Sequence, residues 1–240
     1  MNKSICLFVL VMLFGACKGE SVKNTKAESL LTMGQERLLV DEITNLKSVN
    51  IKDIFLLLPD DVFPMEEISK ENRALLLKHI GEDKGFDISS TPIGVCDVSN
   101  GYLNLTGLQY DWEMCYWNLK DGRKLVVVNS GTESGSEIRV FFYQEGKLTD
   151  DQNYQLGGNQ RFELSDFVEV SQMSPDIRKY AEQQFANGAY HLYYRLPQKG
   201  TSITISLDID DLVDDQENYD VFYEASKDVI LKWKDEEWER

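Results

Sequence analysis

Five aspartates crowd a short segment near the end of the 240-residue chain. They are Asp208, Asp210, Asp211, Asp214 and Asp215. Calcium binds about six to eight oxygen atoms, and clustered carboxylates can supply them. The segment lacks the central glycine and terminal glutamate of an EF-hand loop, so a solvated loop between strands is the alternative interpretation. Apart from this calcium hypothesis, no cofactor is predicted.

Two cysteines, Cys96 and Cys115, remain once the two near the N-terminus are set aside. A disulfide between them would persist in an oxidising compartment. Eighteen residues separate the two, and closing such a loop stabilises a fold by about 3 kcal/mol. The alternative is a pair of reduced cysteines that act as small hydrophobic residues in adjacent hairpins.

Aromatic residues gather at two places in the chain, residues 110–117 and 190–194. If they are exposed on a concave sheet, such side chains form a surface that binds a protein or a glycan. The binding residues predicted on this basis are Tyr110, Trp112, Tyr190 and Tyr193. Burial of the same residues in central strands is the alternative.

The usual catalytic motifs are missing from the sequence. His79 and His191 have no second ligand at a metal-binding spacing. Neither a Gly-x-Ser-x-Gly motif nor a phosphate-binding Walker loop occurs, and residues 131–135 have the composition of a flexible loop. An enzyme is therefore the less favoured class, since a hydrolase would have to use carboxylates that no spacing identifies.

The N-terminal residues have the organisation of a secretion signal. Lys3 supplies a positive charge, residues 5–14 are almost wholly apolar, and two small residues precede Cys17. The apolar run is roughly half as long as a bilayer-spanning helix, so we predict that residues 1–16 are removed. The end of this segment resembles the bacterial lipobox. That resemblance implies that Cys17 is the lipidated first residue of the mature protein, held at the membrane by several acyl chains.

The residues that follow Cys17 bear on its location. The residue after Cys17 is Lys18 and not an aspartate. In this respect the sequence resembles outer-membrane lipoproteins of Gram-negative bacteria. Residues 17–20 also loosely resemble the surface-export signal of Bacteroidetes lipoproteins, from which they depart by a glycine. We therefore predict a lipid-anchored protein of the outer membrane that faces the periplasm or the surface.

The rest of the chain is acidic but contains enough hydrophobic residues for a core. Over all 240 residues, the N-terminal segment included, the formal net charge is -16 and 42% of the residues are hydrophobic. Such a surface repels the phosphates of nucleic acids, so the expected partners are the membrane, through the lipid, and an envelope protein or a glycan. Residues 17–48 are predicted to be a tether that includes a helix. Residues 49–240 are predicted to be one domain, with halves at 49–150 and 151–240 as the alternative.

Helix signals occur twice in this domain. One helix is predicted over residues 69–80, with Ser69 at the N-cap position, residues 75–77 on the core face and Gly81 at the end. The other is predicted over residues 175–186, where Ser174 and a following proline begin the helix and an Asn-Gly pair ends it.

Alternating patterns predict strands around these helices. Two-residue turns are expected at residues 100–101 and 121–122, and the second of these would set Trp117 opposite Val126. Both faces of the strands are apolar, so they are predicted to be central strands. Further strands are expected over residues 138–143, 190–196, 201–209, 219–223 and 229–234, and a tight turn at 235–236 would set Trp233 opposite Trp238.

The order of elements is helix, meander, helix, meander. This order predicts an α+β fold in which an antiparallel meander sheet carries helices on one face. A pseudo-duplicated helix–meander unit is a further hypothesis within that class. A single continuous sheet and two separate layers are both compatible with the pattern.

One stretch resembles a known but uncharacterised family of Bacteroidetes secreted proteins. The resemblance rests on residues 53–60, on Glu71-Asn72-Arg73 and on the hairpin from Tyr102 to Phe141. It covers residues 51–145 and implies no activity, so it supports the compartment and the fold class alone.

These observations favour a non-catalytic binding or scaffold role for an envelope-anchored lipoprotein. Two other functions stay open. One is a hydrolase of glycan or peptide, which a deep pocket with two carboxyl groups would favour. The other is an inhibitor or regulator of another envelope protein, which a large exposed apolar patch would favour.

Overall fold

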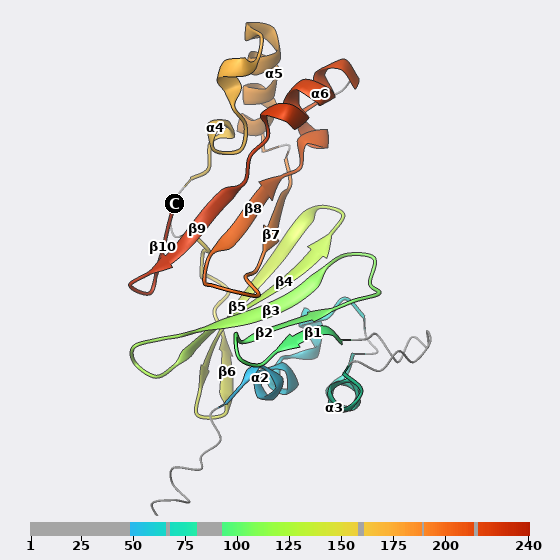
Figure 1. Ribbon diagram of the computed structural model, residues 1–240, viewed down its shortest axis with the longest axis vertical. Helices are drawn as coiled ribbons and strands as arrows, with labels where there is room; N and C mark the ends of the chain where they lie inside the picture. Colours follow the sequence, from blue (N-terminus) through green and yellow to red (C-terminus); the bar gives the residue numbers. More distant parts are fainter. Residues whose placement is uncertain (1–48, 66–67, 81–92, 158–160, 189, 214–215) are drawn as a thin grey trace, which may run out of the picture. The chain divides into compact units, whose positions relative to one another are not determined.

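Two antiparallel sheets form the centre of the molecule (Figure 1). The computed structural model describes residues 49–65, 68–80, 93–157, 161–188, 190–213 and 216–240, which belong to one compact unit. The first sheet is a six-stranded meander in the order β1 to β6, and the second has the order β10-β9-β8-β7. The predicted α+β class with an antiparallel meander is thereby confirmed, whereas a duplicated unit is not.

The strands of the six-stranded sheet are β1 (Ile93–Asp97), β2 (Tyr102–Leu105), β3 (Trp112–Asn118), β4 (Lys124–Thr132), β5 (Gly135–Gln144) and β6 (Lys147–Asp150). The strands of the four-stranded sheet are β7 (Leu192–Arg195), β8 (Ile203–Leu207), β9 (Val229–Lys234) and β10 (Glu237–Glu239). The helices are α2 (Ile51–Leu57), α3 (Lys70–Lys78), α4 (Leu164–Phe167), α5 (Pro175–Ala186) and α6 (Gln216–Ala225), with short 3-10 turns η1 (Asp60–Val62), η3 (Val170–Gln172) and η4 (Ile209–Leu212).

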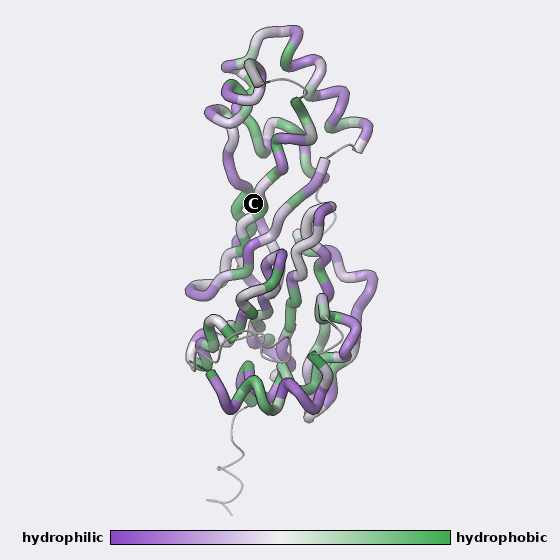
Figure 2. The backbone as a smooth tube through the Cα atoms, turned by 90° about the vertical axis from the view of Figure 1, so that its right-hand side faces the viewer, coloured by the Kyte–Doolittle hydropathy of each residue, from purple (hydrophilic) through white to green (hydrophobic). Residues whose placement is uncertain are grey.

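Each face of the six-stranded sheet has its own core. Helices α2 and α3 cover one face, where Ile54 and Phe55 are fully buried together with Met114 of β3. On the other face Cys115 and Trp117 share a core with the four-stranded sheet and the helices attached to it. We call these the helix-covered core and the inter-sheet core. Figure 2 shows hydrophobic segments along the strands of both sheets.

The first hairpin is longer than predicted. A two-residue turn would place Val98 opposite Leu103, but Cys96 is the partner of Leu103 and Val98 lies in the turn, 42% exposed. Asp97 explains the longer turn, because its carboxylate accepts hydrogen bonds from the Asn100 amide groups. The register moves by two residues, so Cys96, Leu103 and Leu105 keep their predicted common face, whereas Val98 leaves it.

The pairing register of the second hairpin differs from the prediction by a single residue, and this difference changes which side chains share a face. Trp117 pairs with Leu125 and not with Val126. The Leu119 amide donates to the Arg123 carbonyl beyond the strand ends, which leaves a loop of residues 120–122 that ends with Gly122 at φ 87°. A shift of one residue exchanges the two faces of β4. The sequence could not exclude either register, since both faces of β4 are apolar and both are buried.

The second half of the domain agrees with prediction except at one element. Helix α5 has the predicted bounds, with the Ser174 hydroxyl accepting from the Ile177 amide, and Trp233 pairs with Trp238 as expected. Residues 219–223 were predicted as a strand, but they belong to helix α6. The tether and the helix predicted within residues 17–48 lie outside the described residues. Within the described part of the chain, no helix has the length and hydrophobicity needed to cross a membrane.

Candidate functional site

A cavity of about 590 Å³ lies between the six-stranded sheet and strands β7 and β8. Its size falls in the usual range for small-ligand sites, about 300–1,000 Å³. We call it the inter-sheet cavity. Its lining residues are Tyr102, Asn104, Gln109, Tyr110, Asp111, Trp112, Glu113, Asn129, Gly131, Ser136, Tyr193, Tyr194, Arg195 and Ser206.

A row of polar side chains forms the floor of this cavity. Asn104 of β2, Glu113 of β3 and Asn129 of β4 are direct cross-strand partners, so all three side chains lie on the same face. Further along β3 and β4, the same face carries the apolar residues of the inter-sheet core. The polar row therefore marks the place where the apolar packing between the sheets ends.

Glu113 is the centre of this row and is only 5% exposed. Its Oε1 accepts hydrogen bonds from the Leu196 amide at 2.6 Å and from Asn129 Nδ2 at 3.0 Å. Its Oε2 accepts a hydrogen bond from the Tyr102 hydroxyl at 2.8 Å. Burial raises the pKa of Glu113, and the three hydrogen bonds oppose that rise without cancelling it.

Side chains of the six-stranded sheet hold the backbone of β7 in place. Ser136 Oγ accepts from the Tyr194 amide at 2.9 Å, and Asn129 Nδ2 donates to the Tyr194 carbonyl at 2.6 Å. Glu113 Oε1 accepts a hydrogen bond from the amide of Leu196, two residues further along the same segment. Strand β8 pairs with only one edge of β7, and these side chains provide hydrogen-bond partners for backbone groups on the other edge. They thereby hold Tyr193 in place as part of the cavity wall.

The loop that enters β3 forms the opposite wall. The Gly131 amide donates to the Asp111 carbonyl at 2.8 Å, which draws Tyr110 against β4. A Cβ atom at Gly131 would lie 3.1 Å from Tyr110 Cβ and 3.2 Å from the Asp111 carbonyl oxygen. Glycine therefore accommodates the close approach of this loop, and a larger residue would require its neighbours to move by a few tenths of an ångström.

Chemically, the cavity combines aromatic walls with amide, hydroxyl and charged groups. Asp111 and Arg195 are exposed members of its lining, one of each charge. Both oxygens of Glu113 are occupied by protein donors, so this carboxylate shapes the site and organises its neighbours. The Oδ1 atom of Asn129 is buried and has no hydrogen-bond partner among the described residues.

Comparisons with protein families, with curated proteins and with solved structures find no match for this chain. Its function must therefore be argued from the site itself. The resemblance of residues 51–145 to a secreted family stays a prediction.

Three of the four predicted binding residues border the inter-sheet cavity, but the ring of one of them, Trp112, lies in the helix-covered core. Tyr110 and Tyr193 both line the inter-sheet cavity. The Trp112 side chain is 1% exposed and stacks on Phe63 in the helix-covered core, where its Nε1 donates to the Val62 carbonyl at 2.8 Å. Its ring is therefore not available to a ligand.

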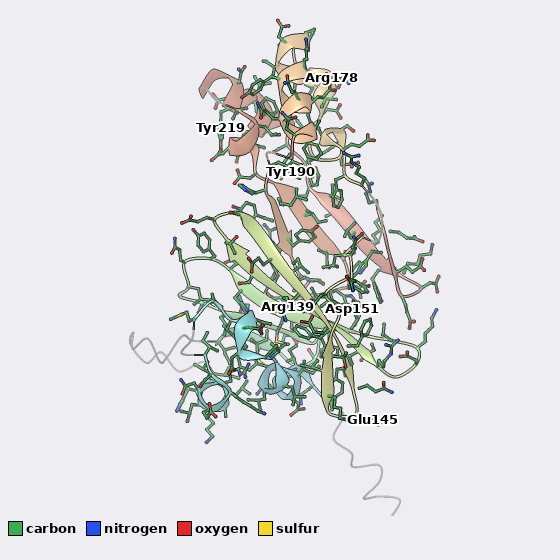
Figure 3. All side chains as sticks on the ribbon, turned by 180° about the vertical axis from the view of Figure 1, so that it is seen from behind. Arg139, Glu145, Asp151, Arg178, Tyr190 and Tyr219 are labelled. Carbon is green, nitrogen blue, oxygen red and sulfur yellow. The ribbon has the colours of Figure 1, made fainter. Side chains whose placement is uncertain are left out.

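Tyr190 is also placed away from the cavity. Its ring stacks on Phe185 of α5, with centroids 4.1 Å apart and an interplanar angle of 4°. Figure 3 shows it just below the helices, distant from the labelled Arg139 of the six-stranded sheet. Glu113 and Asn129, by contrast, were missed, although a charged residue inside the apolar strand Trp112–Asn118 was a visible signal.

The two cysteines are free, so the structure agrees with the alternative of two reduced cysteines and not with the disulfide. Cys96 pairs with Leu103, whose partner on the other side is Met114, so Cys96 lies on the face of the helix-covered core. Cys115 lies on the opposite face, with strand β2 between them. Burial raises the pKa of both thiols, which keeps them protonated.

The predicted calcium ligands form no metal site in the described part of the chain. No group of three or more His, Cys, Asp or Glu residues is arranged there to hold an ion. Asp208 instead caps η4, with its carboxylate accepting from the Asp210 amide at 3.1 Å. Asp214 and Asp215 lie outside the described residues, as does the predicted lipidation site Cys17, and the side chain of Asp211 is not described.

Proposed function

We propose that this protein is an envelope-anchored lipoprotein that binds a small polar ligand in the inter-sheet cavity and does not transform it. The observation that carries the proposal is the cavity itself. Six strands, β2 to β5, β7 and β8, place aromatic, amide, hydroxyl and charged side chains around about 590 Å³. Cavities that combine apolar walls with a few fixed polar groups are the usual form of ligand sites.

The hydrogen bonding of Glu113 supports binding over catalysis. A general acid must give its proton to a substrate, but both Glu113 oxygens are engaged by protein donors. The aromatic walls and the mixed charge of Asp111 and Arg195 suit a fragment of an envelope glycan or peptide.

Soluble fragments of cell-wall glycopeptide are the probe that tests this proposal. We expect them to bind the full chain in isothermal titration calorimetry, and we expect Tyr193→Ala to weaken binding by at least about tenfold. Tyr223→Ala is the matched control, since Tyr223 is 65% exposed on α6 and lies outside the cavity. Equal affinities of the two variants, or no binding by any fragment, would refute the proposal.

The lipid anchor is a separate part of the proposal. It rests on the N-terminal sequence, in which a short apolar run ends in small residues and Cys17. Cys17→Ser should move the protein from the membrane fraction into the soluble fraction of its native host. Mass spectrometry of the native chain should find an acylated residue 17 at the N-terminus, and an unmodified residue 17 would contradict the anchor.

A second candidate function is the hydrolysis of a glycan or peptide. One observation favours it, because two carboxyl residues, Asp111 and Glu113, line the same cavity and burial raises the pKa of Glu113. Release of new reducing ends or amines from the same cell-wall fragments, abolished by Asp111→Asn, would establish hydrolysis. Binding without release would leave the non-catalytic role in place.

A further inference from the structure

A second cavity, of about 370 Å³, lies elsewhere on the molecule and shares no lining residue with the inter-sheet cavity. It is bounded by the β1–β2 turn, the end of β3, the β7–β8 connection and strand β9. The residues that the argument uses are Ser99, Asn100, Asn118, Thr201, Trp117 and Trp233. We call it the tryptophan cavity.

The lining of the tryptophan cavity is uncharged, although 28% of the chain is Asp, Glu, Lys or Arg and the net charge is -16. Two charged groups at its margin, those of Asp97 and Lys124, are engaged by the protein. The Asp97 carboxylate accepts from Ser99 Oγ at 2.6 Å and from Asn100 Nδ2 at 2.7 Å. The Lys124 ammonium binds Asn118 Oδ1 and lies 4.3 Å from the centroid of a neighbouring tyrosine ring. The polar side chains of the lining carry amides and hydroxyls and stand beside aromatic rings.

The aromatic wall is held rigidly. Trp117 Nε1 donates to the Thr201 carbonyl at 3.1 Å, which ties β3 to the β7–β8 connection. The rings of Trp117 and Trp233 have centroids 6.0 Å apart, and Trp238 packs against both. Trp233 is half-buried, so part of its ring stays exposed to a ligand. A preformed wall of this kind costs little ordering entropy when a ligand binds.

We propose that the tryptophan cavity binds a neutral saccharide. A sugar ring presents an apolar C–H face, which suits an indole ring, and a rim of hydroxyl groups, which suits amides and hydroxyls. A charged ligand would lose hydration on entering a site that offers no opposite charge in return. This inference concerns a different site from the proposed function and does not depend on it.

A panel of neutral and charged oligosaccharides, applied to the full chain in titration calorimetry, tests the proposal. We expect a neutral member to bind with an affinity that is unchanged between about 50 and 500 mM NaCl, because no ion pair is formed. Thr201→Trp should fill the cavity from an exposed position and weaken binding at least about tenfold. Thr149→Trp, at an exposed position of β6 that lines neither cavity, should bind like the wild type.

The outcomes separate the two sites. Loss of saccharide binding in Thr201→Trp but not in Tyr193→Ala supports the tryptophan cavity. The reverse pattern overturns it and moves the saccharide to the inter-sheet cavity. Binding of charged members alone, or of none, also overturns it. If Thr201→Trp lowers the melting temperature, Asn118→Trp replaces it as the blocking variant, since Asn118 is exposed at the end of β3.

Discussion

At the scale of single residues, Glu113 shows how a buried carboxylate can be tolerated in a core. Transfer of a lone charge into a protein interior is costly, and hydrogen bonds from three donors offset much of that cost here. The donors come from β2, from β4 and from the residue after β7. Glu113 therefore joins the two sheets as well as forming the floor of the cavity.

The effect of replacing Glu113 should depend on whether an acceptor is kept. Glu113→Ala leaves the Leu196 amide without its acceptor and removes one acceptor each from Asn129 and Tyr102, and we expect it to lower the free energy of unfolding by about 3 kcal/mol. Glu113→Gln keeps one oxygen for these donors and removes the buried charge, so its change should stay within about 1 kcal/mol. Urea unfolding of the full chain measures both, and equal losses would contradict the role assigned to the hydrogen bonds.

The raised pKa of Glu113 also predicts the sign of a pH effect. Between the ordinary carboxyl pKa and the raised value, the folded state binds more protons than the unfolded state. The contribution of Glu113 to the free energy of unfolding is therefore largest at low pH and falls as the pH rises through this window. Subtracting the Glu113→Gln profile from the wild-type profile, from about pH 4 to pH 8, isolates this contribution. A difference that grows with pH would contradict the assignment.

At the scale of elements, two turn glycines allow conformational strain to be separated from steric contact. Gly101 and Gly146 both end hairpin turns, at φ 68° and 81°. A Cβ at Gly146 meets no atom within 4 Å, whereas one at Gly101 would lie 2.7 Å from the Tyr116 ring. Gly146→Ala should cost about 1 kcal/mol for its positive φ alone, and Gly101→Ala should cost about 1–3 kcal/mol more. Equal losses in thermal unfolding would show that Tyr116 moves aside freely.

Elements with local start and stop signals could be predicted from the sequence. Helix α5 has Ser174 before it, a proline at its first position and Asn187 at its end, and its bounds agree with the prediction. Helix α6 has no proline at its first position and no glycine or asparagine after its last residue, and from the sequence the aspartates that precede it are interpreted as calcium ligands or as a loop. Tyr219, Val221 and Tyr223 alternate like a strand, but Phe222 is buried and Tyr223 is exposed because α6 packs on the inter-sheet core. Tertiary packing decided this element, and the hydrophobic period did not reveal it.

The candidate site could be predicted only in part for a related reason. Tyr110 and Tyr193 were found because aromatic residues are recognisable by type. The role of Glu113 depends on a backbone amide 83 residues away in the chain. No local sequence pattern indicates such a distant partner. The one-residue shift at the second hairpin shows that even the register of neighbouring strands cannot be predicted from the hydrophobic pattern when both faces are apolar.

At the scale of the whole molecule, the inter-sheet core contains residues from both of the halves, 49–150 and 151–240, that the sequence offered as an alternative to one domain. Leu125 and Val127 of β4 share this core with Ile203 of β8 and Leu231 of β9. Neither half could bury these side chains without the other. Residues 49–240 should therefore unfold as one cooperative unit, in keeping with their description as a single compact unit.

Two core truncations, one in each core, test this cooperativity. Leu231 lies in the inter-sheet core and Ile54 in the helix-covered core, and both are fully buried. Each change to alanine should lower the free energy of unfolding by about 2–5 kcal/mol. In a single cooperative unit, Ile54→Ala must shift the whole unfolding transition. The tryptophan residues of β9 and β10 must then report the same shift, although the Ile54 side chain lies in the other core and does not contact them. Urea unfolding followed by both circular dichroism and tryptophan fluorescence should therefore give coincident midpoints in each variant. A biphasic curve, in which Ile54→Ala moves one phase only, would mean that the six-stranded sheet and the four-stranded sheet unfold separately and that the inter-sheet core couples them weakly.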